Sequence, residues 1–176
     1  GVNVYGVSER YLNVYGEKDL RAQMNQFFHR TYTHPVDGTT LDMKMLCNWY
    51  WYDETAILET GKGTKDWNFY RYAETLLSAA EAIAQSSGVN AEAAGYLAQV
   101  KARANMEGKD VSTIASELQR LGKQAFIEEC WKERLREFPL EMKIWDDCVR
   151  TGKFPQISAT NKGEVQFVDL IGATNG

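Results

Sequence analysis

The feature that most constrains the fold is a stretch of helical periodicity that begins near Asp66. Apolar side chains recur there at spacings of three and four residues, which places them on one face of an α-helix. The sequence Ser86-Ser87-Gly88 ends the pattern, so we predict one amphipathic helix before Gly88. Its apolar face holds Phe69, Ala73, Leu76, Leu77, Ala80, Ile83 and Ala84.

A second helix is expected after a short turn. Asn90 can cap it, because the side-chain oxygen can accept hydrogen bonds from free amides of the first turn. The buried face of this helix then holds Ala93, Leu97, Val100 and Ala104. Two helices joined by so short a turn form an αα-hairpin, which is also the unit of tetratricopeptide-like arrays.

Further helices are predicted toward the carboxyl end. Ser112 or Thr113 can cap a third helix. Residues 123–138 are amphipathic and end at Pro139, which lacks an amide hydrogen and clashes with the preceding turn. A short helix should follow from Glu141 to Val149. From Lys153 onward we expect a loop with at most one strand, at residues 164–170.

The region before Asp66 lacks a sustained period. We predict a loop-rich segment over residues 1–65, with a short helix from Lys18 to Arg30 and a β-prone aromatic run at residues 46–52. A helical core over residues 66–155 and a loop tail over residues 156–176 complete one structural domain. The predicted fold is mainly α, with tetratricopeptide-like helix pairs and loop-rich, partly irregular extensions.

Composition excludes several classes of protein. A mean hydropathy of -0.45 is too low for a chain largely buried in a membrane, and the longest apolar runs are too short to span a bilayer. The net charge of -4 offers no large positive field for nucleic acid. The three cysteines are odd in number and have no C-x-x-C spacing, so buried free thiols are expected rather than zinc ligands or disulfides.

Enzymatic signatures are missing from the sequence. Asp146 and Asp147, like Glu128 and Glu129, are adjacent on a helix and point in different directions, so neither pair can flank a glycosidic bond. The chain has no G-x-S-x-G motif and no phosphate-binding loop. The two histidines, at positions 29 and 34, have no companion at metal-ligand spacing. We therefore expect no catalytic activity, no metal and no cofactor.

An aromatic run is the candidate ligand platform. Sugar rings need flat aromatic faces for their C–H surfaces, together with polar groups for their hydroxyls. Asp53 and Glu54 follow the run and add such polar groups. A segment packed in the core would have the same composition, so both interpretations stand. The four aromatic residues are Trp49, Tyr50, Trp51 and Tyr52.

A polar stripe lies on the helix that follows Asp66 and contains Arg71, Glu74, Ser78, Glu81 and Gln85. It can be a solvated face, or its charges can meet those of the later helices in a buried structural network. We favour the network over catalysis, because buried charges need partners in any protein. Its other members would be Arg134, Glu137, Glu141 and Arg150.

Three segments resemble the SusD/RagB family. Residues 71–82 are similar to the family's R-Y-A-E-x-L-L-x-x-A-E-A helix, and residues 96–104 to its Y-L-N-x-V-R-x-R-A helix. Residues 133–152 resemble E-R-x-x-E-L-x-x-E-G-x-R-W-x-D-L-x-R-x-G, with Met142 where the family favours Gly. Asp19-Leu20-Arg21 is a looser match to an upstream D-x-R segment. The chain is thus similar to the C-terminal region of a divergent member.

The resemblance implies a role and a location. Such proteins are surface-exposed lipoproteins of the bacterial outer membrane that bind an oligosaccharide or a peptide and deliver it to a SusC-like TonB-dependent transporter. They are longer, so we expect this chain to be a piece whose lipid anchor, the one contact with the membrane, lies outside it. The helical hairpin alone leaves one alternative, a tetratricopeptide-like scaffold for protein–protein interaction.

Overall fold

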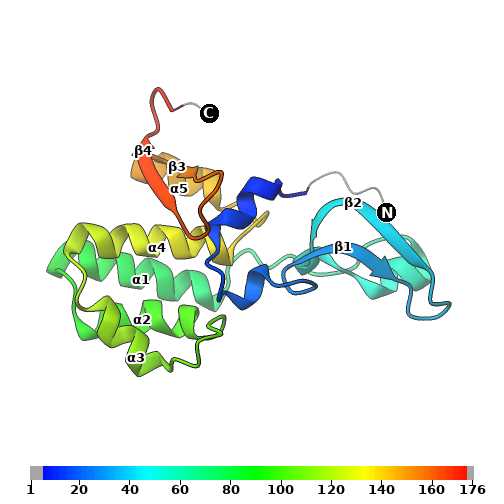
Figure 1. Cartoon of the computed structure of the whole chain (residues 1–176), viewed down its shortest axis with the longest axis horizontal. Coiled ribbons are helices and arrows are strands. Elements are labelled where there is room, and N and C mark those ends of the chain that lie inside the picture. Colours follow the sequence, from blue (N-terminus) through cyan, green and yellow to red (C-terminus); the bar gives the residue numbers. More distant parts are fainter. Residues whose placement is uncertain (1–5, 174–176) are drawn as a thin grey trace.

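The computed structural model describes residues 6–173 and confirms a mainly helical fold. Figure 1 shows helices α1 to α4 side by side at one end and a β-hairpin at the other. The helices are α1 (Tyr72–Ser87), α2 (Ala91–Ala102), α3 (Val111–Leu118), α4 (Lys123–Glu137) and α5 (Ile144–Thr151). The strands are β1 (Phe28–Thr33), β2 (Thr40–Asn48), β3 (Lys153–Ile157) and β4 (Val165–Asp169).

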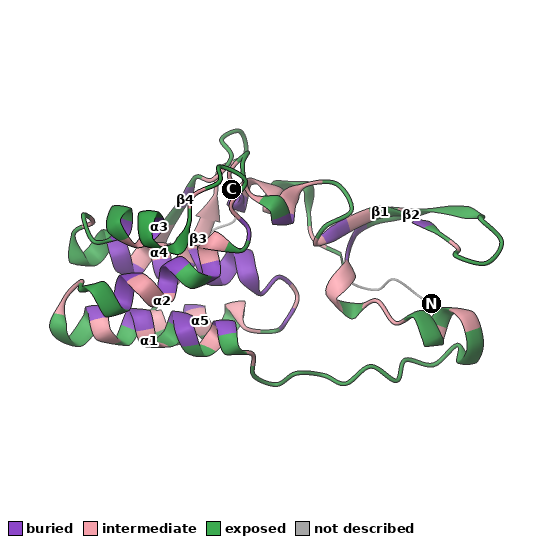
Figure 2. Cartoon of the chain, turned by 90° about the horizontal axis from the view of Figure 1, so that it is seen from below, coloured by how far each residue is buried: buried purple, intermediate pink, exposed green. Residues whose placement is uncertain are grey.

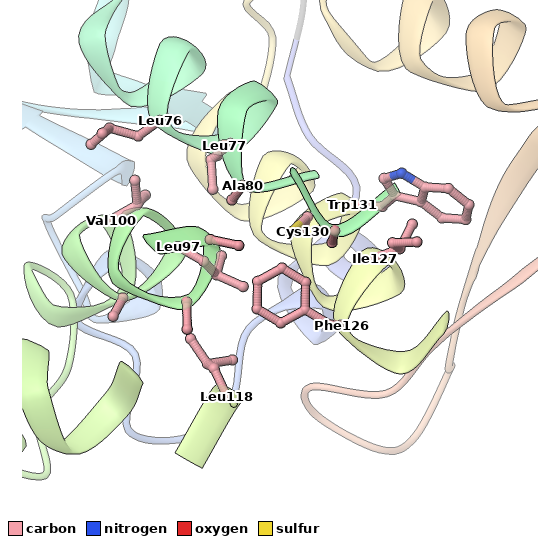
Figure 3. Close-up of a cluster of buried hydrophobic side chains, with 14 of the residues drawn as sticks. Leu76, Leu77, Ala80, Leu97, Val100, Leu118, Phe126, Ile127, Cys130 and Trp131 are labelled. Carbon is pink, nitrogen blue, oxygen red and sulfur yellow. The ribbon is translucent and has the colours of Figure 1, made fainter. Parts of the chain in front are cut away.

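The main core lies between the first four helices. Helix α1 packs against α2 and α4, and α2 packs against α3. Phe126 of α4 is fully buried and points toward Leu97 of α2 and Leu118 of α3 (Figure 3). The apolar faces predicted for the first two helices are therefore confirmed in their central turns, where Leu77, Ala80, Ala84, Ala93 and Leu97 have no exposed surface.

Helix boundaries differ from the predictions where side chains take up other contacts. α1 begins at Tyr72 and not at Asp66, because Arg71 is extended, and Phe69 lies before the helix with 60% of its surface exposed. Asn90 caps α2 as predicted, with Oδ1 accepting from the amide of Ala93 at 2.9 Å. The cap of α3 is Asp110, not Ser112 or Thr113.

The predicted helix from Lys18 to Arg30 is wrong. Residues 18–20 instead bond to the chain that leaves α2: the amide of Leu20 donates to the carbonyl of Ala104 at 2.8 Å. One 3₁₀ turn (Leu20–Ala22) follows, and Asn25 has a φ of 59°, which an α-helix does not allow. The chain then enters β1, which pairs antiparallel with β2.

The aromatic run is divided between two structures. β2 ends at Asn48, and Trp49–Trp51 form a single 3₁₀ turn, so the β-prone interpretation holds only for the first part of the run. Asn48 closes this turn, because its Oδ1 accepts from the amide of Tyr50 at 2.9 Å. Figure 2 shows that this end of the molecule is much less buried than the helices.

The segments after α4 also depart from the predictions. Leu140 and Met142 have left-handed backbones, with φ of 59° and 61°, so α5 starts at Ile144 rather than Glu141. A strand at residues 164–170 is confirmed by β4. The loop expected from Lys153 onward, which includes the tail from residue 156, is wrong where β3 pairs antiparallel with β4.

Candidate functional site

The carboxyl-terminal half of α4 buries charged side chains. Glu133, Arg134, Arg136 and Glu137 are each at most 8% exposed. Buried charges must be paired, because removing an ion from water costs roughly several kcal/mol. The second half of α4 is therefore expected to form buried ion pairs with other segments.

The last backbone carbonyl groups of α4 also have hydrogen-bond donors. Its last carbonyl groups have no partner within the helix and need donors from elsewhere. Tyr11 Oη donates to the carbonyl of Leu135 at 2.6 Å, and Tyr15 Oη donates to that of Arg136 at 2.9 Å. Arg71 Nη2 donates to the carbonyl of Glu137 at 2.9 Å. Segments far apart in sequence thus meet at one helix terminus.

Arg71 joins the start of α1 to two glutamates. Its Nε and Nη2 donate to the two oxygens of Glu141 at 2.8 and 2.7 Å, a bidentate pair. Nη1 donates to Glu137 at 3.1 Å. These three residues were all among the expected network, and the structure brings them together.

A second group of charges joins α4 to α1 and α5. Arg134 pairs with Asp147 at 2.7 Å and with Glu74 at 3.5 Å. Arg150 places both amino groups 2.8 Å from the oxygens of Glu81, which also accepts from Trp131 Nε1. The structure thus pairs the expected network residues of α1 with those of α4 and α5. Whether they contribute only to stability stays a prediction.

Sequence reasoning missed a third group. Arg21 binds Asp19, Glu133 and Glu137, and Arg136 binds Glu129 and Glu133. Burial alone would raise the pKa of Glu133, but the positive charges of Arg21, Lys101 and Arg136 lower it to about 2. The signal available in the sequence was the short segment Asp19-Leu20-Arg21, whose partners lie more than a hundred residues away.

A cavity of about 380 Å³ opens beside this network, between the aromatic run and the ends of α2 and α4. Its volume is within the range of small-ligand sites. Aromatic, amide and charged side chains line it together. They are Gln26, Phe27, Asn48, Trp49, Tyr50, Arg71, Arg103, Glu137, Pro139 and Glu141.

The four candidate ligand residues are placed differently. Trp49 and Tyr50 line the cavity, whereas Trp51 and Tyr52 do not. The indole of Trp49 is parallel to the rings of His29 and Tyr52, at centroid distances of 3.7 and 4.4 Å, so its faces are engaged inside the protein. Phe27, which sequence reasoning did not single out, lies in the wall beside Tyr50.

The two glutamates in the walls of the cavity are held in ion pairs with arginines, so both carboxylates already have partners within the protein. In the part of the chain that the structure describes, no group of His, Cys, Asp and Glu side chains could hold a metal ion. The cysteines at 47, 130 and 148 are buried thiols, as predicted.

The fold places the chain among helical proteins with tetratricopeptide-like helix pairs. A sequence model of the SusD family matches residues 10–170, and the chain belongs to this family. None of the helices within residues 6–173 is long and apolar enough to cross a membrane.

A solved structure agrees with this assignment. The chain is similar to a SusD superfamily protein from Parabacteroides distasonis, with a TM-score of 0.75 and 26% sequence identity. The similarity covers 94% of this chain and 34% of that protein, so the chain spans about a third of the length of its relative. A comparison with curated proteins finds no significant match.

Proposed function

We propose that this chain is part of a non-catalytic nutrient-binding protein. It would capture an oligosaccharide at the outer-membrane surface, as a lipoprotein, and deliver it to a SusC-like TonB-dependent transporter. The family match over residues 10–170 carries the proposal, and the cavity beside Tyr50 gives it a location. A peptide is the other ligand that the family resemblance allows.

The walls of the cavity provide what sugar recognition requires. The rings of Phe27 and Tyr50 can contact the C–H face of a pyranose, while Gln26 and Arg103 can bond to hydroxyl groups. The ring of Tyr50 is held in place by two cations, since the guanidinium of Arg71 lies 5.7 Å and the ammonium of Lys65 5.3 Å from its centroid. A ring fixed in this way loses little entropy when a ligand binds.

Binding can be tested with a glycan array followed by calorimetry. We expect Phe27→Ala and Tyr50→Ala to weaken the binding of any glycan that the array identifies. Trp67→Ala is the matched control, because Trp67 is 52% exposed and does not line the cavity. An equal loss of affinity in all three variants would contradict the assignment of the site, and hydrolysis of a bound polysaccharide would contradict a non-catalytic role.

The delivery step requires a separate test. The protein would be purified from its native outer membrane without denaturation, and a co-purifying TonB-dependent transporter would support the proposed partnership. Protease treatment of intact cells would show whether the protein is exposed at the surface. Recovery of the protein only from the cytosol would exclude both the transporter and the location.

An exposed aromatic cluster favours the alternative of a protein-binding scaffold. Trp67, Phe69, Tyr70 and Tyr72 are between 52% and 72% exposed, and Lys143 lies under the rings of Phe69 and Tyr70. Patches of this kind mark interaction surfaces. If the alternative holds, a double variant Phe69→Ser and Tyr70→Ser will abolish binding to a protein partner, whereas Tyr50→Ala will not.

A further inference from the structure

Arg103 is the cation at the cavity that keeps free hydrogen-bonding capacity. It lies directly after α2 and is 58% exposed, which is far more than Arg71 or Arg21. Within residues 6–173 it makes one ion pair, in which Nη2 donates to Glu137 Oε1 at 2.9 Å. A guanidinium carries five N–H donors, so most donors of Arg103 are left for solvent or a ligand.

The carboxylates of the cavity are already occupied. Glu137 accepts from Arg71 and Arg103 on Oε1 and from Arg21 on Oε2. Both oxygens of Glu141 accept from Arg71. The charged groups in the walls therefore offer a ligand more donors than acceptors.

A smaller cavity of about 120 Å³ adjoins the first, and arginine and glutamate side chains line it as well. The two share Gln26, Phe27, Arg103 and Glu137, so Arg103 lies where they meet. The charged residues that line the pair are three arginines and two glutamates, namely Arg21, Arg71, Arg103, Glu137 and Glu141. An anionic ligand group is what the unpaired donors of Arg103 would complement, because the two glutamates already accept hydrogen bonds from arginines.

We propose that the cavity selects a sugar that carries a carboxylate, a uronic acid unit, and that Arg103 is the specificity-determining residue. This inference rests on the function proposed above and names its class of ligand. The carboxylate accepts hydrogen bonds from the free edge of the Arg103 guanidinium, in the planar geometry that arginine favours. The pyranose ring then lies against Phe27 and Tyr50, which line the same cavity.

Calorimetry with two matched probes tests the inference: tri-galacturonate and its fully methyl-esterified form. They share one sugar skeleton and differ in charge. We expect the acid to bind more tightly, and to lose affinity as salt is added, because ions screen partly exposed charges. In Arg103→Met, affinity for the acid should fall about 10- to 100-fold, as expected for losing charge-assisted hydrogen bonds, while affinity for the ester changes little.

Arg30→Met is the control variant. Arg30 is 55% exposed and pairs with Glu9, so it resembles Arg103 in exposure and pairing, but it does not line the two cavities. It should leave affinity for both probes unchanged. A thermal melt of each variant shows whether it is folded, and Arg103→Lys should restore part of the affinity for the acid because it keeps the charge.

Any one of five results would overturn the inference. If the acid and the ester bind equally, or if Arg103→Met weakens both alike, the carboxylate is not recognised at this site. If tri-glutamate binds in an Arg103-dependent way and tri-galacturonate does not, the ligand is an acidic peptide. If the glycan array shows neutral glycans alone, the class of ligand is wrong but the proposed function stands. If no glycan binds, both the proposed oligosaccharide binding and the inferred class of ligand are wrong.

Discussion

The first two turns of α4 pack through apolar side chains, whereas its last two turns pack mainly through charged ones. Phe126, Ile127 and Cys130 lie in the helical core. Glu133 and Glu137 pair with cations of other segments, and Arg136 pairs with glutamates of α4 itself. All six of these side chains are buried. The difference shows that one helix can be held at its first turns by hydrophobic contacts, which have no preferred direction, and at its last turns by ion pairs, which require specific partners.

The cavity lies beside the charged half. Glu137 lines it and also holds Arg71 and Arg103 in place, so the packing of the half-helix and the shape of the cavity depend on the same side chains. The apolar half supplies the scaffold for this arrangement. The following experiments perturb the apolar half, the charged half and the loop after α4, each against its own control.

Removing the largest apolar side chain of the first half should have the largest effect. Phe126→Ala should lower the free energy of unfolding by about 3–5 kcal/mol, because Phe126 is fully buried and its loss leaves a cavity. Phe69→Ala, at a 60% exposed position, should change it by less than about 0.5 kcal/mol. Urea denaturation measures both values, and similar losses would mean that the core is not centred on Phe126.

Removing a buried cation from the second half should have the next largest effect. Arg134 is 6% exposed, so Arg134→Ala removes a buried cation from Asp147 and Glu74 and should cost about 3 kcal/mol, although Asp147 keeps Arg150 and Glu74 keeps Lys143. Arg30→Ala removes an exposed pair and should cost less than about 1 kcal/mol. Arg134→Ala should lower the melting temperature and leave ligand affinity nearly intact. A normal melting temperature with lost affinity would assign Arg134 to binding.

Acid should weaken the charged half before the apolar one. The pKa of Glu133 is lowered in the folded protein to about 2, so its ion pairs contribute fully above its ordinary pKa of 4.5 and are lost as the pH falls toward 2. The free energy of unfolding should therefore decrease as the pH falls through this interval. Denaturation at several pH values measures the slope, which should be shallower in Glu133→Gln. An unchanged slope in that variant would contradict the assignment.

The loop that follows α4 offers the smallest effect, with the opposite sign. Met142 has a φ of 61° and is 74% exposed, so its side chain costs conformational energy and contributes little packing. Met142→Gly should stabilise the protein by about 0.5–1 kcal/mol. Met24→Gly is the control at an 85% exposed methionine without a left-handed backbone, and it should not stabilise. Equal shifts in melting temperature would show that the backbone at Met142 is unstrained.

The backbone at Met142 also gives a reason for the Gly that the family favours at this position. The matching segment of the family favours Gly at this position, and a left-handed backbone is a conformation that Gly adopts without cost. The sequence comparison could flag the position but could not supply this reason. Pro139, by contrast, ended α4 as predicted, because its effect on the helix is local.

The residues of the candidate site could likewise be predicted only where a local pattern marked them. Arg71, Glu74, Glu81 and Glu141 could be singled out because helical spacing or a motif drew attention to them. Phe27 and Arg103 could not be recognised as cavity residues, since no local pattern shows that the segment before β1 reaches the end of α2. The sequence left both a ligand platform and core packing open for Trp49, and in the structure its ring lies against those of His29 and Tyr52.

The helical core could be predicted from local patterns, since apolar spacing and caps act within a few residues and are visible in any one segment. Long-range contacts were needed to show that residues 18–27 form no long helix, that Glu137 binds three arginines, and that a cavity opens beside them. An ion pair between Arg21 and Glu133 joins residues 112 positions apart. Only folding brings such groups within the few ångströms at which charges select their partners.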